Sequence, residues 1–352
     1  MGEYFNQAQD KNGQVIYKYN QEQSITTPPH LAAVFQPPDS WQTLFWDNSQ
    51  GHTLRVGISS PQSDPKGILF SALGASEFME NDFEFIREIN DLGFTVITFD
   101  PFGQGCSDRR HPDHRYALPK PFTEHGQDIA EILQEIVHPW KNEFCPDGSL
   151  VGLGKSQGAN HLLHALHANP DHGLDRIILG APMLGHPAFT RYGRFGLVTP
   201  YARILELSEV FRSSVSPADQ EYNPGKFLKS VPLPLKYNDP RSFQTEDKAR
   251  RRLRFKWIRE NPQLANSIFT SGWIRRAFEG CRTIQSPEVL KQIDIPTLLL
   301  KATRDQIVCN PSIELVHAKL PNSHLIEING THDLLMEDPT IRGQVIQASA
   351  DF

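Results

Sequence analysis

The sequence of 352 residues has no long apolar run, because its most hydrophobic stretches, such as Ile68–Leu73 and Leu298–Leu300, are short. A membrane-spanning helix needs about 20 consecutive apolar residues. The polar N-terminus, MGEYFNQAQDKNGQ, also lacks the basic and apolar regions of a secretory signal and the Ser or Thr at position 6 of a myristoylation site. The sequence therefore predicts a soluble protein with neither a secretory signal peptide nor a myristoylation site.

Cysteine is scarce and the charge balance is mild. The four cysteines are far apart in the chain and form no CxxC pair: Cys106, Cys145, Cys281 and Cys309. This spacing favours reduced thiols in a cytoplasmic protein over disulfides or a zinc site. The formal net charge of −6 gives no reason to expect a nucleic-acid partner.

Aromatic residues are plentiful, with 21 Phe, 8 Tyr and 5 Trp, so the chain can bury a sizeable core and is not a disordered protein. Residues 1–40 are polar and rich in Gln, Asn and Pro, which predicts an N-terminal extension with little core of its own. The next two strand-like segments, 42–46 and 53–58, flank a turn-like NSQG and predict a hairpin.

Beyond this hairpin, strand patterns and helix patterns alternate. Strands are expected at 67–72, 94–99, 149–153, 176–179, 296–302 and 323–328. Helices are expected at 82–91, 123–137, 159–168, 311–320 and 339–348. This order predicts an α/β fold with a mostly parallel central sheet flanked by helices on both faces.

Residues 185–293 interrupt the alternation with short helical patterns, several prolines, many aromatics and no good strand. We therefore predict an α/β core made of residues 41–184 and 294–352, with a helical cap inserted at 185–293. The length of the chain by itself indicates one large domain or two ordinary ones. One domain with an inserted cap accounts for this length.

The strongest motif is Gly154-Lys155-Ser156-Gln157-Gly158, a G-x-S-x-G sequence between an expected strand and an expected helix. In this context Ser156 is a candidate nucleophile on a sharp turn, and Gly154 and Gly158 let strand and helix approach closely. The positive end of the helix dipole would face a developing oxyanion. A phosphate-binding P-loop is the alternative, but its first glycine would have to stand at position 149, where the chain has Ser149.

A serine nucleophile needs a base that takes its proton and an acid that orients the base. Asp305 follows the strand expected at 296–302, and His332 follows the strand expected at 323–328. The order Ser156, Asp305, His332 is that of α/β-hydrolases, so we predict these three as catalytic residues. The alternative is that Asp305 and His332 only cap local structure, and Asp333 and Asp294 are weaker candidates for the acid.

The loop Gly74-Ala75-Ser76-Glu77 resembles the G-x-x-E loop of monoacylglycerol lipases and bacterial lysophospholipase L2-type enzymes, which are α/β-hydrolases. The turn DPFGQGCS at 100–107 is similar to their D-x-x-G-x-G-x-S turn, and the resemblance extends over about residues 40–350. It implies an oxyanion hole formed by the backbone N–H groups of Ala75 and Gln157. Where this family often has histidines, the chain has Leu73 and Lys155, which leaves the substrate subclass open.

Other reactive side chains have simpler interpretations. Cys106 has no matched histidine and is interpreted as a packed cysteine. His161, His164 and His167 recur along one helix, and His111 and His114 lie in a polar loop; none has a clear set of metal ligands beside it. We expect neither a metal nor an organic cofactor.

The expected cap contains a basic stretch at 248–259 whose Lys and Arg residues are interleaved with Leu, Phe, Trp and Ile. It is either an amphipathic helix that meets anionic lipid or a phosphate-bearing substrate, or a solvated face paired with Glu246 and Glu260. The segment with Arg241, Arg252 and Trp273 loosely resembles the cap of lysophospholipase L2-type proteins, which favours the first interpretation.

Together these features predict a cytoplasmic serine ester hydrolase that cleaves acyl-glycerol or lysophospholipid-like esters through an acyl-enzyme. The first interpretation of the basic stretch adds peripheral contact with a membrane or lipid surface through the cap. A small acyl ester is the expected partner. Two alternatives stay open: a peptidase, thioesterase or acyltransferase with the same residues, or a ligand-binding relative without turnover.

Overall fold

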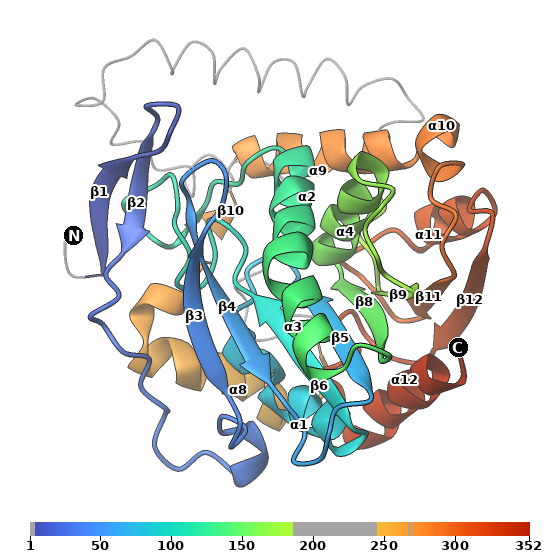
Figure 1. The fold of residues 1–352 in the computed structure, drawn as a ribbon, viewed down its shortest axis with the longest axis horizontal. Coiled ribbons are helices and arrows are strands. Elements are labelled where there is room, and N and C mark those ends of the chain that lie inside the picture. Colours follow the sequence, from blue (N-terminus) through green and yellow to red (C-terminus); the bar gives the residue numbers. More distant parts are fainter. Residues whose placement is uncertain (1–3, 186–244, 267, 270) are drawn as a thin grey trace.

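The computed structural model describes residues 4–185, 245–266, 268–269 and 271–352, and an eight-stranded sheet lies at its centre (Figure 1). The strands follow the spatial order β12-β11-β9-β8-β5-β6-β4-β3. Their bounds are β3 (Gln42–Asp47), β4 (Thr53–Ser59), β5 (Gly67–Ala72), β6 (Phe94–Phe99), β8 (Ser149–Lys155), β9 (Arg176–Gly180), β11 (Thr297–Ala302) and β12 (Ser323–Ile328). Only the pairs that include β4 are antiparallel among these neighbours, so the predicted hairpin and the mostly parallel sheet are both confirmed.

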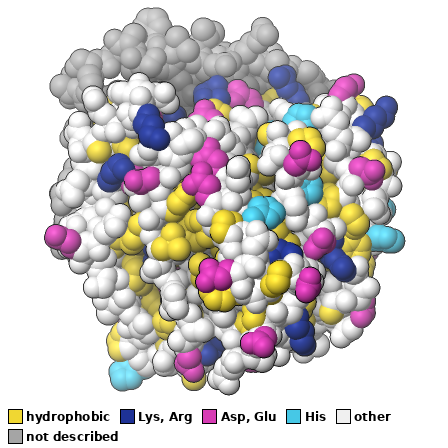
Figure 2. Space-filling model, viewed as in Figure 1, with side chains coloured by type: hydrophobic (Ala, Val, Ile, Leu, Met, Phe, Trp, Pro, Cys, Tyr) yellow, Lys and Arg dark blue, Asp and Glu magenta, His cyan; other side chains and the backbone are white. Residues whose placement is uncertain are grey.

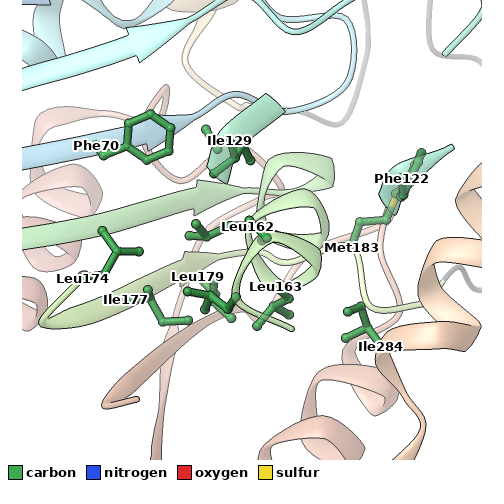
Figure 3. Packing of buried hydrophobic residues seen from close by; sticks show 14 of the residues in the cluster. Phe70, Phe122, Ile129, Leu162, Leu163, Leu174, Ile177, Leu179, Met183 and Ile284 are labelled. Atoms are coloured by element: carbon green, nitrogen blue, oxygen red, sulfur yellow. The ribbon is translucent and has the colours of Figure 1, made fainter. Parts of the chain in front are cut away.

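Helices cover both faces of this sheet because its buried strands are apolar on both sides. In β5, Ile68 and Phe70 pack into one core cluster while Leu69 packs into the other. The first cluster contains buried residues of α2 (Phe122–Ile132), α4 (Gln157–Ala168) and α11 (Asn310–His317). Figure 3 shows part of it, with Phe70 of the sheet near Ile129 and Leu162 of the helices.

The second cluster lies on the other face and holds buried residues of α1 (Phe83–Asp91) and α12 (Pro339–Asp351). The expected helix at 123–137 is longer in the structure: α2 continues through a π-helical turn at 133–137 into α3 (His138–Phe144). The helices expected from the sequence therefore lie on both faces of the sheet, with α2, α4 and α11 on one face and α1 and α12 on the other.

The N-terminal residues form a hairpin of β1 (Phe5–Gln9) and β2 (Val15–Tyr19). Its side chains do not make a core by themselves, but Ile16 is fully buried in the first cluster of the main body. Backbone hydrogen bonds between Tyr17 and Arg109 join β2 to the loop after β6. The hairpin is thus attached to the α/β body by main-chain and side-chain contacts.

Apart from Gly185, the described residues of the expected cap start at 245, and they contain α8 (Lys248–Glu260), α9 (Ser271–Ile284) and α10 (Pro287–Leu290). It also contains a short strand, β10 (Ile268–Phe269), which pairs with β7 (Tyr116–Ala117), although no good strand is expected there. α9 crosses α2 and α4 in Figure 1 and packs against both. Arg241 and most of the expected cap lie outside the described residues, so the division into extension, core and cap stays a prediction.

One face of the molecule carries charges of both signs. Figure 2 shows acidic and basic side chains interspersed over the described part of one face. No helix in the described ranges combines the length and the hydrophobicity that crossing a bilayer requires.

Candidate active site

Ser156 occupies the turn between β8 and α4, and it is the single residue between them. Its φ of 49° and ψ of −114° lie in a region that non-glycine residues rarely adopt. A Cβ on Gly154 would come within 2.5 Å of Ala159 Cα, and one on Gly158 within 2.2 Å of the Ala72 carbonyl oxygen. Both glycines are therefore needed for the close approach of strand and helix, as the motif predicts.

The structure brings the side chains of Ser156, His332 and Asp305 into one hydrogen-bonded chain. His332 Nε2 lies 2.9 Å from Ser156 Oγ, and His332 Nδ1 lies 2.7 Å from Asp305 Oδ2. The aspartate follows β11 and the histidine follows β12, so adjacent parallel strands deliver both side chains to the sheet edge where β8 ends. This arrangement fits a nucleophile, a base and an orienting acid.

Local hydrogen bonds determine the charge of Asp305. Burial alone would raise the pKa of this carboxyl, but the charge and hydrogen bond of His332 lower it, with help from the N–H groups of Ile307 and Val308. These groups donate to Asp305 Oδ1 at 2.7 Å and 3.0 Å. The pKa therefore lies below its ordinary value, and the carboxylate is ionised at neutral pH.

His332 is buried, which by itself lowers its pKa, but the Asp305 carboxylate outweighs burial and the pKa is raised overall. An ionised Asp305 favours the tautomer in which Nδ1 carries the proton. Nε2 is then free to accept the proton of Ser156 Oγ. The pair thus matches the electrostatic requirements of a general base.

The two backbone groups proposed for the oxyanion hole lie in different elements. Gln157 is the first residue of α4, where N–H groups have no helical acceptor, and Ala75 lies buried in the loop after β5. Neither N–H donates to a backbone or side-chain acceptor among the described residues. Both donors are therefore available to a bound oxygen.

The loop that carries Ala75 is held by side chains of its own and of the following turn. Gln104 accepts a hydrogen bond from Ser76 N at 2.6 Å and donates one to the Gly74 carbonyl at 3.0 Å. Glu77 Oε2 accepts from Gly74 N at 2.7 Å. The turn at 100–107 thus supports the loop at 74–77, which explains why both motifs occur together.

That turn is itself built around Asp100. Its carboxylate accepts hydrogen bonds from Arg55 Nε at 2.7 Å and Cys106 N at 2.9 Å. Gly105 has a φ of +50°, and a Cβ there would lie 2.0 Å from Asp100 Oδ2. The aspartate and the glycine of the motif therefore have structural roles.

Lys155, which departs from the family pattern in the sequence, is buried next to the candidate nucleophile Ser156. Its Nζ lies 2.9 Å from Glu77 Oε2 and 2.7 Å from Asp82 Oδ1. Lys155 stands next to Ser156 in the sequence, but no local sequence pattern shows that Glu77 and Asp82 are its ion-pair partners.

The alternative acids lie elsewhere. Asp294 is exposed and precedes β11, at the end of the strand opposite to Asp305. Asp333 is next to His332, but the side chain that hydrogen-bonds to His332 Nδ1 is Asp305. Burial, the largest effect, raises the pKa of Asp333 to about 7, with Glu77 and Asp82 contributing in the same direction.

A small cavity of about 20 Å³ adjoins the site and is lined by polar and apolar side chains, including Lys155, Ser156, His332, Asp333 and Leu300. One water molecule needs roughly 10–15 Å³ of such volume. The cavity can therefore hold a water molecule but not an acyl chain.

The remaining reactive residues are packed in the interior or the adjoining loops. Burial raises the pKa of the Cys106 thiol to about 12, so it is not a ready nucleophile. His161 stacks on His125 with ring centroids 4.3 Å apart, and burial lowers the pKa of His164 to about 4. Across the described ranges, no three His, Cys, Asp or Glu side chains are grouped as a metal site requires.

Comparison with known families adds an independent observation to this geometry. The profile described as serine aminopeptidase, S33, matches residues 63–339, which is most of the chain. The chain belongs to this family of α/β-hydrolases. This S33 hydrolase is also similar to a probable lysophospholipase L2 of Haemophilus influenzae, with 24% identity over 309 residues covering 84% of this chain and 86% of that protein.

Solved structures support the fold of this S33 hydrolase. A carboxyl esterase from Bacillus coagulans has a TM-score of 0.65 at 17% identity, with 90% of this chain and 98% of that chain covered. A soluble variant of the monoglyceride lipase from Saccharomyces cerevisiae has a TM-score of 0.63 at 15% identity, with 92% and 98% covered. The predicted α/β-hydrolase fold and the family resemblance are confirmed.

Proposed function

We propose that this S33 hydrolase is a serine ester hydrolase that cleaves acyl-glycerol or lysophospholipid-like carboxylic esters through an acyl-enzyme. The observation that carries the proposal is the hydrogen-bonded chain from Ser156 Oγ through His332 to Asp305. The assignment to carboxylic ester hydrolases agrees with the lysophospholipase and monoglyceride lipase among the similar proteins.

In the first half-reaction, Ser156 Oγ attacks the acyl carbonyl carbon while His332 Nε2 takes the hydroxyl proton. Asp305 stabilises the resulting imidazolium. The carbonyl oxygen becomes an oxyanion that receives hydrogen bonds from the N–H groups of Ala75 and Gln157. Collapse of this intermediate breaks the ester C–O bond, and the leaving alkoxide takes the proton from His332.

In the second half-reaction, a water molecule attacks the acyl-enzyme while His332 accepts one of its protons. The second tetrahedral intermediate uses the same two N–H donors, and its collapse returns the proton to Ser156 Oγ and releases the fatty acid. Removal of one oxyanion donor typically lowers turnover by about 10²–10³-fold. The chain's own residues supply every proton transfer, and no cofactor takes part in these steps.

The proposed substrate class rests on the similar proteins. The fold and the three side chains specify acyl transfer but not the leaving group. The family description also names an aminopeptidase, so amide substrates belong in any test. We further propose that the cap, expected at 185–293, selects the substrate.

A lipid surface is the proposed partner of the protein, and α8 the element that meets it. Leu253 and Trp257 are buried, and Arg250 is buried in an ion pair with Glu84. The solvent-facing side of α8 is basic with one large exposed apolar side chain, and its exposed residues are Lys248, Ala249, Arg252, Phe255, Lys256 and Arg259. Such a face can attract anionic headgroups and insert a phenylalanine at their boundary.

The alternative interpretation is that Glu246 and Glu260 pair with the basic residues of α8, and the ion pairs agree with it only in part. Glu246 forms its ion pair with Arg304, while Glu260 pairs with Arg259. All four cysteines are buried and lie far apart in the chain without a CxxC pair, which supports the proposed cytoplasmic location, peripheral to a membrane when α8 is engaged.

The experiment that tests the function compares the wild type with Ser156→Ala. The wild type should react with a fluorophosphonate probe and hydrolyse monoacylglycerols, lysophospholipids or aryl esters, and Ser156→Ala should do neither. The control is Ser149→Ala, at the opposite end of the same strand, which should keep both activities.

Each other outcome has a defined meaning. Undiminished labelling of Ser156→Ala would overturn the nucleophile assignment. Turnover of aminoacyl amides but of no ester would identify a peptidase. Labelling of the wild type without turnover of any substrate in the panel would support a ligand-binding relative.

A further inference from the structure

Lys155 directly precedes the proposed nucleophile at the end of β8, and its side chain is only 6% exposed. A buried ammonium group is costly unless it is paired and hydrogen-bonded. Here Nζ lies between two carboxylates, Glu77 at 2.9 Å and Asp82 at 2.7 Å. Both partners come from the segment after β5, so the lysine joins that segment to the end of β8.

The contact with Glu77 reaches the proposed oxyanion hole. Glu77 Oε2, the oxygen nearest to Lys155, also accepts the hydrogen bond from Gly74 N at 2.7 Å. Gly74 and Glu77 flank Ala75 in the loop, so one carboxylate oxygen connects β8 to the backbone next to the Ala75 N–H. We propose that Lys155 is a positioning residue that holds this N–H at the correct distance from Ser156.

The pair stays ionised over the working pH range. Burial is the largest effect on both groups, but Asp82 and Glu77 outweigh it and raise the pKa of Lys155, and Lys155 likewise lowers the pKa of Glu77. Asp82 has its pKa raised by burial despite Lys155, and Glu77 adds to that rise. Lys155 and Glu77 are therefore joined by an ion pair with 2.9 Å between Nζ and Oε2, and Nζ also donates a charged hydrogen bond of 2.7 Å to Asp82 Oδ1.

A second support makes the effect of Lys155 separable from folding. Gln104 holds Ser76 N and the Gly74 carbonyl through two hydrogen bonds that do not involve Lys155. Loss of Lys155 should therefore displace the loop relative to Ser156 without releasing it. A displacement of about 1 Å in a catalytic group can lower the rate by about 10²-fold.

This inference rests on the proposed function, since it assumes that Ala75 N–H binds the oxyanion. The test uses Lys155→Met, which keeps the length of the side chain and removes its charge, with p-nitrophenyl butyrate as substrate. The kcat should fall by about 10²-fold with little change in KM, because the interaction is made in the transition state. Lys301→Met is the control, because Lys301 is also a strand lysine between two carboxylates, Glu314 and Glu327, and should keep wild-type kcat.

Three further measurements distinguish positioning from other roles. The fall in kcat of Lys155→Met should persist on the pH-independent plateau of the pH–rate profile. A changed pKa of His332 alone would only shift the acidic limb of that profile. Glu77→Gln should show the same loss, and the double variant should lose no more than either single variant because both act through one contact. Thermal unfolding of each variant checks that it folds, and Glu77→Gln carries the test if Lys155→Met does not.

A folded Lys155→Met with kcat within twofold of wild type would overturn the inference, as would additive losses in the double variant. The proposed function would survive that outcome as long as Ser156→Ala is inactive. If Ser156→Ala keeps full activity, the proposed function and this inference are both wrong.

Discussion

Trp273 Nε1 on α9 donates a hydrogen bond to Gln157 Oε1 over 2.9 Å, and both side chains are buried. Gln157 is the first residue of α4 and the proposed source of one oxyanion N–H. The residue that forms this bond comes from the expected cap, more than a hundred positions later in the chain. The bond therefore couples the part of the protein that would select substrate to the turn that carries Ser156.

Trp273→Phe should lower kcat for ester hydrolysis by about tenfold. The phenyl ring fills most of the same space but cannot donate, so Gln157 Oε1 loses its partner at a cost of about 1–3 kcal/mol. Steady-state kinetics with an aryl ester measure the effect. Trp140→Phe, on the partly exposed α3, is the control and should leave kcat unchanged. If Trp273→Phe has the same kcat as the wild type, the proposed coupling between the cap and Gln157 is wrong.

Asp305→Asn should lower kcat by about 10⁴-fold, because an amide can donate to Nδ1 and favour the wrong tautomer of His332. The substitution preserves size, so the loss should come without a large change in thermal stability. Asp294→Asn, at the opposite end of β11, serves as the matched control. A near-wild-type rate for Asp305→Asn would transfer the role of the acid to Asp333.

The pH dependence of kcat/KM should report the protonation of His332, since only the neutral imidazole accepts the serine proton. Its pKa is raised above the ordinary 6.5, despite burial, by Asp305 and to a smaller extent by Asp333 and Glu77. Activity should therefore fall with decreasing pH at a midpoint above 6.5. The pKa of Asp333 is raised to about 7, so this carboxyl is only partly ionised near that midpoint. Asp333→Asn removes this partial negative charge and should move the midpoint slightly to lower pH, and an unchanged midpoint or a rise would refute this electrostatic link.

Cosedimentation with vesicles tests the basic face of α8. The triple variant Arg252→Gln, Lys256→Gln and Arg259→Gln should bind vesicles of anionic lipid more weakly, and added salt should reduce wild-type binding in the same way. Arg250→Gln is a useful contrast, because its ion pair with Glu84 is buried and its loss should lower thermal stability instead. If the triple variant sediments with the vesicles as fully as the wild type, α8 does not dock on lipid.

Features encoded by neighbouring residues could be predicted from the sequence. The strand at 67–72 and the hairpin at 42–58 follow from periodicity and turn residues, and G-x-S-x-G identifies a sharp turn before any coordinates are known. The N-terminal hairpin shows the limit of this reasoning. Its DKNG turn is a recognisable signal, but the flanking polar residues favour an extension, and the burial of Ile16 depends on the body against which it packs.

The sequence alone determined the fold class and the candidates Ser156, Asp305 and His332, because each candidate follows a strand whose pattern is local and parallel strands end at one edge of the sheet. Only the tertiary structure decided which groups surround them. Lys155 pairs with Glu77 and Asp82, and Trp273 bonds to Gln157, across separations that no short-range pattern encodes. The partner of a buried charge or donor depends on which loops meet around it, and that is a property of the folded chain.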